Sequence, residues 1–178
     1  MKILLVGEYS RLHNSLKEGL IQNGHEVTLL GSGDGFKNFP SDILIKSTIF
    51  NQAGYKFIAK LFDKFFNIQL LELEYYYKTK NIIANLKGFD VVQLINEQSL
   101  KTSPKNEIKL ISQLVKQNKS LFLLSCGTDY TSVNYALDKK FKYSILSPYF
   151  EDLSLKNHYR FILKYVSAPY KKLSDFLH

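Results

Sequence analysis

The sequence predicts an α/β fold, a three-layer α/β/α sandwich around a mostly parallel sheet. Two observations lead to this prediction. Short apolar runs that suit buried strands alternate with amphipathic segments of helical length, and glycine or polar turn residues separate them. Because parallel strands need a crossover between them, this alternation indicates βαβ units with right-handed connections. With 178 residues, 45% of them hydrophobic and 22% charged, the chain has the size and composition of one globular domain.

The first βαβ unit is predicted at the N-terminus. KILLVG (2–7) is a continuous apolar run, as in strands that are covered on both faces. The helix after it begins at residue 10 or 11 and ends near Gly24, which suits the left-handed conformation that follows a helix C-terminus. HEVTLL (25–30) is the second strand. The apolar stripe of the helix consists of Leu12, Leu16, Leu20 and Ile21.

The same pattern continues along the chain. A third strand is predicted at DILIKS (42–47), and helical periodicity covers the middle segment, 52–78. A buried strand follows Gly88, at 89–95. Ser103 and Pro104 then suit the N-cap and first position of a helix that reaches about Gln117, followed by a strand at 121–125. Strand FKYSIL (141–146), helix 154–163, and a strand at 164 that turns at Pro169 into a last helix complete the prediction.

This arrangement is Rossmann-like, and in such sheets ligands bind beyond the carboxyl ends of the strands. Three loops therefore matter most. They are GEYSRLH (7–13), NEQSLKTS (96–103) and CGTDYTS (126–132). The three-glycine G-x-G-x-x-G fingerprint of dinucleotide-binding folds is absent from the first of them, where Gly7 stands alone.

Composition excludes several classes of protein. The single cysteine, Cys126, rules out an internal disulfide or a multi-cysteine zinc site, and the four histidines lack metal-ligand spacing. The N-terminus does not resemble a secretory signal, and no apolar run is long enough to cross a bilayer, so we expect a cytoplasmic protein. The formal net charge of +8 favours anionic partners such as nucleic acid, phosphorylated small molecules or an anionic membrane surface.

The first loop has two interpretations. Gly7 lets the backbone approach a ligand closely, and the helix N-terminus behind it favours an anion. Alternatively, Gly7 only makes the tight turn that packs the helix on the sheet. His13 lies near the same edge, where it is either a ligand-facing base or a packed side chain.

The other two loops are equally open to two interpretations. Asp129, after Gly127 and Thr128, either orients a substrate hydroxyl or caps the helix that begins near Tyr130. Asn96 and Glu97 lie at the end of a strand. Either they bind the hydroxyls of a sugar or nucleotide, or they belong to a solvated loop.

The middle segment is rich in aromatic and basic residues. Lys56, Lys60 and Lys64 recur every four residues and form one stripe on a helix beside a wide apolar face. Such a helix either lies in a membrane interface or covers the sheet with its lysines in water. No RNP-type aromatic motif or helix-turn-helix pattern is present, so we expect no nucleic-acid partner.

Four segments together resemble retaining glycosyltransferases of the GT-B fold (glycosyl transferase family 4-like). MKILLVGEYSRLHNSLKEGLIQNGHEVTLL looks like the N-terminal strand, loop, helix and "GHEV" entry into the second strand of that family. FDVVQLI, LFLLSCGTDY and KYVSAPYKKLSDFL are similar to its later strands and to its Gly-Ser/Thr-Asp turn. The likeness covers most of the chain in order. Two departures are Glu8 in place of a second glycine and Cys126 in place of a histidine.

The resemblance implies that residues 1–178 form a single domain, the acceptor-side half of a two-domain GT-B enzyme. The partner domain in the native chain would hold the nucleotide sugar, and the acceptor would be a polysaccharide or a lipid-linked glycan. No metal or other cofactor is implied, and this half alone would be inactive. Peripheral contact with the inner face of the cell membrane is also expected.

In this interpretation Gly7 lies near the donor diphosphate and Asp129 is the candidate catalytic residue. The residues expected to line the acceptor cleft are Glu8, Tyr9, Ser10, His13, Asn96, Glu97, Gly127 and Thr128. The alternatives are a stand-alone flavodoxin-like or receiver-like module and a peripheral membrane-binding module. A receiver needs paired acidic residues after the first strand, where this chain has only Glu8.

Overall fold

The computed structural model describes residues 1–34, 37–46, 49–50, 52–66 and 70–178. The chain divides into two compact units, Met1–Leu124 and Ser125–His178. Unit 1 holds the sheet, and unit 2 is helical. The expected single domain over residues 1–178 stays a prediction.

Unit 1 is built on a five-stranded parallel sheet with the strand order β3-β2-β1-β4-β5. Every neighbouring pair is parallel, which confirms the α/β class. The strands are β1 Lys2–Val6, β2 Glu26–Gly31, β3 Ile43–Leu44, β4 Val91–Leu94 and β5 Ser120–Leu123.

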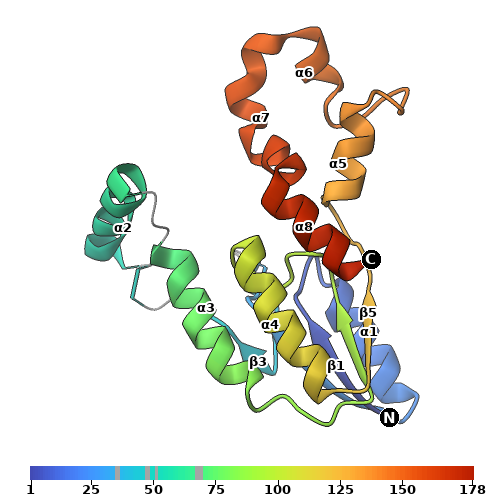
Figure 1. Cartoon of the computed structure of the whole chain (residues 1–178). Helices are drawn as coiled ribbons and strands as arrows, with labels where there is room; N and C mark the ends of the chain where they lie inside the picture. Colours follow the sequence, from blue (N-terminus) through green and yellow to red (C-terminus); the bar gives the residue numbers. More distant parts are fainter. Residues whose placement is uncertain (35–36, 47–48, 51, 67–69) are drawn as a thin grey trace. The chain divides into compact units, whose positions relative to one another are not determined.

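Helices lie on both faces of this sheet. In Figure 1, α3 and α4 lie together on one face and α1 lies on the other. The predicted Rossmann-like three-layer arrangement is therefore confirmed. The helices of unit 1 are α1 Leu12–Gln22, α2 Ala53–Phe66, α3 Leu70–Ile83 and α4 Pro104–Gln117.

The core of unit 1 follows from the alternation of side chains along the strands. Ile3 and Leu5 of β1 pack with Leu29 of β2 against Leu16 and Leu20 of α1. Leu4 and Val6 of β1 point to the opposite face and are fully buried as well. On α4 the buried apolar residues are Leu110, Ile111 and Leu114, at helical spacing. Burial on both faces explains why β1 is a continuous apolar run.

The strand predicted at 42–47 is described as far as residue 46, and Ser47 lies outside the described residues. Among those described, Ile43 and Leu44 pair with β2, and the Ile45 N–H donates to the Gly31 carbonyl at 2.8 Å. Asp42, just before β3, accepts a hydrogen bond of 2.6 Å from the Leu29 N–H and pairs with Lys17 of α1. The Asp42 carboxylate therefore satisfies the Leu29 N–H, in place of a strand-to-strand hydrogen bond.

Unit 2 contains helices packed on a small core of their own. Its buried residues are Val133, Ala136, Leu146 and Ile162. The helices are α5 Tyr130–Leu137, α6 Ser147–Glu151, α7 Lys156–Leu163 and α8 Ala168–Leu177, with 3-10 turns at Leu153–Leu155 and Lys164–Val166.

Both strands that the sequence predicts in this unit are wrong. Residues 141–146 form turns, in which the Ser144 N–H donates to the Ser147 hydroxyl at 2.8 Å and Leu146 enters the core. The segment at 164 is a 3-10 turn, whose Tyr165 and Val166 pack on the same core. Short apolar runs do not distinguish strands from helical turns, and packing decided between them.

Candidate functional site at the carboxyl ends of β1 and β4

The strand order reverses between β1 and β4. From β1 the chain crosses to β2 on one side, whereas β4 and β5 lie on the other. In open parallel sheets, ligands bind outside the carboxyl ends of the strands at this point. We refer to the side chains gathered there as the carboxyl-edge site. It consists of Gly7, Glu8, Tyr9, Ser10, His13, Asp34, Lys37, Asn96, Glu97, Ser99 and Lys101.

Gly7 has a packing role in this site. Its φ angle is +89°, and an added Cβ would lie 2.4 Å from the Cγ2 atom of Ile95 and 3.3 Å from the Ser99 carbonyl oxygen. The loop after β4 therefore packs directly on the Gly7 backbone. The Gly7 N–H donates to the Leu30 carbonyl at 2.8 Å. Its contact with a donor diphosphate stays a prediction.

Glu8 is buried, with 1% of its surface exposed. Its Oε2 atom accepts hydrogen bonds from the backbone N–H of Asn14, at 2.8 Å, and from the Asn14 side-chain amide. Its Oε1 atom is buried and has no hydrogen-bond partner among the residues that the structure describes. A buried carboxylate oxygen without a donor is costly, so a ligand or water that donates a hydrogen bond is favoured here.

His13 is fully buried and presents a second such atom. Its Nδ1 atom lies 2.7 Å from the Gly7 carbonyl oxygen. Because a carbonyl only accepts, Nδ1 carries the proton and Nε2 keeps a lone pair. Burial lowers the pKa of His13, against the opposing effects of the Gly7 hydrogen bond and the Glu8 charge, so the neutral ring is favoured. Nε2 has no partner within the described chain.

Two lysines connect the loops around these acceptors. Lys37 donates to the Ser10 hydroxyl and to Asp34, both at 2.9 Å, and the Ser10 N–H donates to Asp34 at the same distance. Burial by itself would raise the pKa of Asp34, but these hydrogen bonds hold it below its ordinary value. The Lys101 ammonium lies 5.4 Å from the centre of the Tyr9 ring, and burial lowers the Lys101 pKa. The loops after β1, β2 and β4 thus meet at one edge.

Backbone strain concentrates in the same loops. Of the seven non-glycine residues described with positive φ, five lie there: Ser10, Arg11, Asp34, Asn38 and Lys101. Such conformations persist only where the surrounding contacts enforce them, and they are frequent at functional sites.

The loop after β4 is organised by its own polar side chains. Asn96 accepts from the Gln98 N–H at 3.0 Å through Oδ1, and its carbonyl accepts from the Ser99 hydroxyl at 2.6 Å. Glu97 is buried, at 2% exposure. The position of Asn96 and Glu97 at the predicted edge is confirmed, whereas their contact with a ligand stays a prediction.

Sequence reasoning missed several members of the site. Asp34 and Lys37 lie in the loop after β2, for which no ligand-facing role was predicted. Ser99 and Lys101 lie within a loop that was identified, but only its first residues were singled out. Their φ values and contacts depend on the packing of three loops, for which the sequence holds no local signal.

The third predicted loop belongs to unit 2. Asp129 is the N-cap of α5, and its side chain accepts from the Ser132 N–H at 2.7 Å in a reciprocal capping box. Gly127 and Thr128 line a cavity of about 290 Å³ within unit 2, together with residues of α5 and the turn after it. The capping interpretation of Asp129 thus has direct support, while its catalytic role stays a prediction.

We expect Asp129→Ala to lower the free energy of unfolding of unit 2 by about 1 kcal/mol, because one N-cap bond is lost. Asp129→Asn should retain most of the stability, since asparagine caps helices about as well as aspartate. Thermal unfolding followed by circular dichroism measures both variants. Equal losses of stability in Asp129→Ala and Asp129→Asn would contradict the capping role. They would show that the stability depends on the negative charge of Asp129 and not on its N-cap hydrogen bond.

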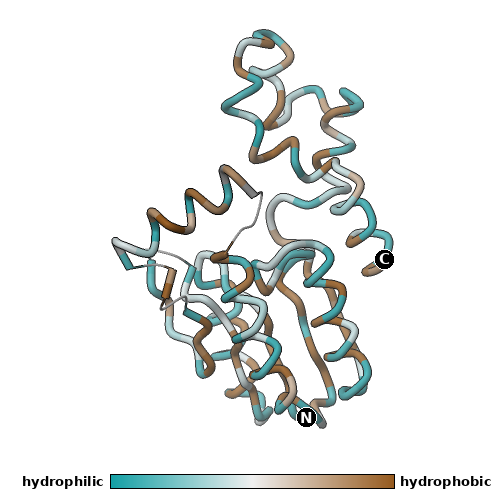
Figure 2. The backbone as a smooth tube through the Cα atoms, turned by 60° about the vertical axis from the view of Figure 1, so that its left-hand side comes forward, coloured by the Kyte–Doolittle hydropathy of each residue, from teal (hydrophilic) through white to brown (hydrophobic). Residues whose placement is uncertain are grey.

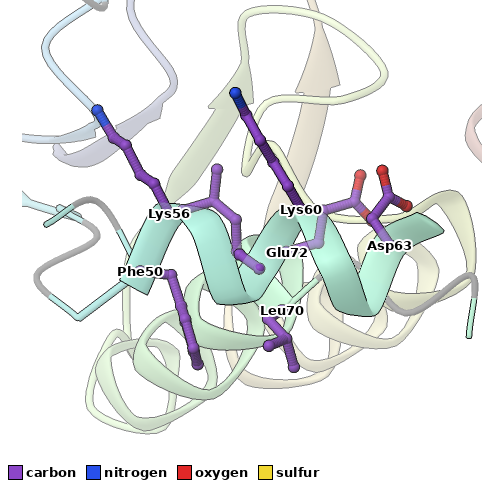
Figure 3. A pocket seen from close by; sticks show the side chains of 8 residues that line it. Phe50, Lys56, Lys60, Asp63, Leu70 and Glu72 are labelled. Atoms are coloured by element: carbon purple, nitrogen blue, oxygen red, sulfur yellow. The ribbon is translucent and has the colours of Figure 1, made fainter. Parts of the chain in front are cut away.

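The predicted lysine stripe lies on α2. Lys56 and Lys60 are exposed and line a cavity of about 380 Å³ between α2 and α3. In Figure 3 the two lysines extend in the same direction from α2. The Lys64 side chain lies outside the described residues.

The chain was compared with protein-family models, curated proteins and solved structures, and none of them matches it. Within the described residues, no group of three or more His, Cys, Asp or Glu side chains is placed to hold a metal ion. Nor does that part of the chain contain a helix with the length and hydrophobicity needed to span a bilayer. The cytoplasmic location stays a prediction.

Proposed function

We propose that this chain is the acceptor-side domain of a retaining GT-B glycosyltransferase, which transfers a sugar from a nucleotide-sugar donor to a polysaccharide or lipid-linked glycan. The single observation that carries the proposal is the pair of buried hydrogen-bond acceptors, Glu8 Oε1 and His13 Nε2, at the reversal point of a parallel sheet. The choice of the glycosyltransferase family rests on the order of the sequence motifs, which resembles that of GT-B enzymes.

The chemistry of the two atoms favours a hydroxyl-rich ligand. A carboxylate oxygen and an unprotonated imidazole nitrogen both accept hydrogen bonds, and sugar hydroxyls donate them. A diphosphate offers only acceptors and would be repelled by the Glu8 charge. The acceptor glycan therefore suits this edge better than the donor does, which supports assigning the chain to the acceptor half.

Sugar transfer of this class needs a positioned hydroxyl and a stabilised leaving group. In the proposed enzyme Glu8 and His13 orient the acceptor hydroxyls, while the nucleotide-binding half stabilises the departing diphosphate. The neutral His13 ring also has a lone pair that can receive a hydroxyl proton.

We expect isotope-labelled chain to show chemical-shift changes at residues 7–14 and 96–101 when oligosaccharides are added in a nuclear magnetic resonance titration. Glu8→Gln should weaken this binding by roughly 10- to 100-fold, because it replaces a charged hydrogen-bond partner with a neutral amide of the same shape. Glu26→Gln, at the opposite end of the sheet, is the matched control and should bind as the unmodified chain does.

Two results would reject this proposal. One is the absence of shift changes with a broad panel of oligosaccharides and nucleotide sugars. The other is oligosaccharide binding that is equally strong in Glu8→Gln, provided that circular dichroism shows the variant to be folded.

A further inference from the structure

We propose that the carboxyl-edge site is selective for an acidic sugar, whose carboxylate binds the Lys101 ammonium beside the Tyr9 ring. This inference rests on the proposed function and deepens it, since it names the chemical class of the glycan acceptor. Lys101 belongs to none of the sequence motifs that resemble the glycosyltransferase family.

The backbone of Lys101 is held in place by its neighbours. The Lys101 N–H donates to the Gln98 carbonyl at 3.2 Å, and the Gln98 side-chain amide donates to the Thr102 carbonyl at 2.6 Å. The Thr102 N–H donates in turn to the buried Glu107 carboxylate at 2.8 Å. Lys101 has a φ angle of +54°, a left-handed conformation that a lysine keeps only where the surrounding contacts enforce it. The side chain of Lys101 therefore extends from a fixed position in the loop after β4.

The Lys101 ammonium is half-buried and only partly compensated. It lies 5.4 Å from the centre of the Tyr9 ring, and a ring face attracts a cation without replacing the oxygen acceptors that its N–H donors can use. Within the part of the chain that the structure describes, this ammonium has no hydrogen bond or ion pair. Burial lowers the pKa of Lys101, whereas the Asp34 charge opposes this and favours the protonated form. Such a cation favours an anionic ligand.

The charges near Lys101 leave one positive charge in excess. Asp34 accepts from Lys37 and from the Ser10 N–H, both at 2.9 Å, so its carboxylate is already compensated. Lys37 also donates to the Ser10 hydroxyl, whose own proton has no acceptor among the described residues. An ammonium and a hydroxyl donor are therefore available to a carboxylate in this part of the site.

An acidic sugar matches both parts of the site. Glu8 Oε1 and His13 Nε2 are buried acceptors that suit hydroxyl donors, and Lys101 adds a positive charge. Figure 2 shows the polarity along the chain: the strands of unit 1 are largely brown, and the loops beyond them include teal and white stretches. A hexuronic acid carries both hydroxyls and a carboxylate on one ring. A neutral sugar leaves the ammonium uncompensated, and a diphosphate has no donors for the two buried acceptors.

Paired acidic and neutral sugars test the inference in a nuclear magnetic resonance titration. Short oligomers of galacturonic, glucuronic and mannuronic acid are each compared with their methyl esters, which keep the shape and remove the charge. We expect the acid form of the preferred oligomer to bind about 10-fold more tightly than its ester, because the ester loses a charge-assisted hydrogen bond. Added salt should narrow this difference, since it screens the charge.

Variants of Lys101 assign the preference to its charge. Lys101→Met should lower the affinity for the acid to that for the ester, whereas Lys101→Arg should keep the preference. Lys116→Gln, at an exposed position in the last turn of α4, is the matched control and should bind as the unmodified chain does. A purely structural role of Lys101 would instead weaken the binding of acid and ester equally.

The inference is overturned if acid and ester bind equally in every pair, or if Lys101→Met keeps the preference for the acid. It is also overturned if uridine diphosphate, rather than any uronate, loses its binding in Lys101→Met, because the ammonium would then belong to the donor. In these cases oligosaccharide binding through Glu8 can still hold, so the proposed function is judged separately. If no oligosaccharide binds, both the proposed function and this inference are rejected.

Discussion

Replacing Gly7 with alanine is expected to lower the free energy of unfolding of unit 1 by roughly 2–5 kcal/mol. Two effects combine. A φ angle of +89° is strained for an alanine, at a cost of about 1–2 kcal/mol. The new Cβ would also lie 2.4 Å from Ile95 Cγ2, and relieving such overpacking costs about 1–3 kcal/mol. Chemical denaturation followed by circular dichroism measures the sum.

Gly24→Ala is a matched control for the conformational part alone. Gly24 has a φ angle of +80°, but no neighbouring atom of the described residues lies within 4 Å of its added Cβ. We expect this variant to lose only about 1–2 kcal/mol. In addition, the cost of Gly7→Ala should shrink when Ile95→Ala removes the obstructing atom, a coupling that a double-mutant cycle detects. Equal losses for Gly7→Ala and Gly24→Ala would contradict the close packing of the β4 loop on β1.

The second large effect concerns Glu107, which is fully buried on α4. Its Oε1 atom accepts from the N–H and the hydroxyl of Thr102, at 2.8 and 3.2 Å, and its Oε2 atom lies 3.4 Å from the Leu100 N–H. Burial raises the pKa of Glu107 to about 8, with a smaller contribution from the Glu72 charge, and the three donors only partly oppose it. The side chain holds the end of the β4 loop against α4.

A raised pKa in the folded state defines the sign of the pH dependence. Between about 4.5 and about 8 the folded chain keeps a proton that the unfolded chain releases. The free energy of unfolding therefore falls as the pH rises through this window. The contribution of one proton is at most about 1.4 kcal/mol per pH unit and on the order of 5 kcal/mol in total.

Glu107→Gln isolates this contribution, because the amide does not titrate. We expect the stability of the variant, relative to the unmodified chain, to improve steadily as the pH rises from about 4.5 to about 8. Urea titrations at several pH values measure the difference, and Glu26→Gln, exposed on β2, provides the baseline. If the stability difference between Glu107→Gln and the unmodified chain is constant from about pH 4.5 to about 8, the expectation is contradicted. Glu107 would then have the same pKa in the folded and the unfolded chain.

The sequence predicted most of unit 1 because local patterns and tertiary structure agree there. The buried run of β1, the stripe of α1 and the Ser103-Pro104 start of α4 each have a physical cause in a few neighbouring residues. The parallel pairing also followed, since alternating strands and helices leave few other connections. The edge that collects Glu8, His13 and Asn96 was predictable for the same reason.

In unit 2 the sequence was less informative. The runs at 141–146 and 164–166 contain β-branched and aromatic residues, but they are too short to show a period. Leu146, Tyr165 and Val166 all pack on the core of unit 2 from turns. That outcome depends on neighbours remote in the chain.

The sequence alone determined the α/β class, the parallel sheet, the loops at its carboxyl edge and the amphipathic character of α2. Each of these follows from periodicity or from the conformational limits of single residues. Only the tertiary structure decided that Gly7 packs against Ile95, that Glu8 and His13 bury acceptors without donors, and that α2 turns its aromatic face outward. These features depend on which surfaces meet, and no local pattern specifies that.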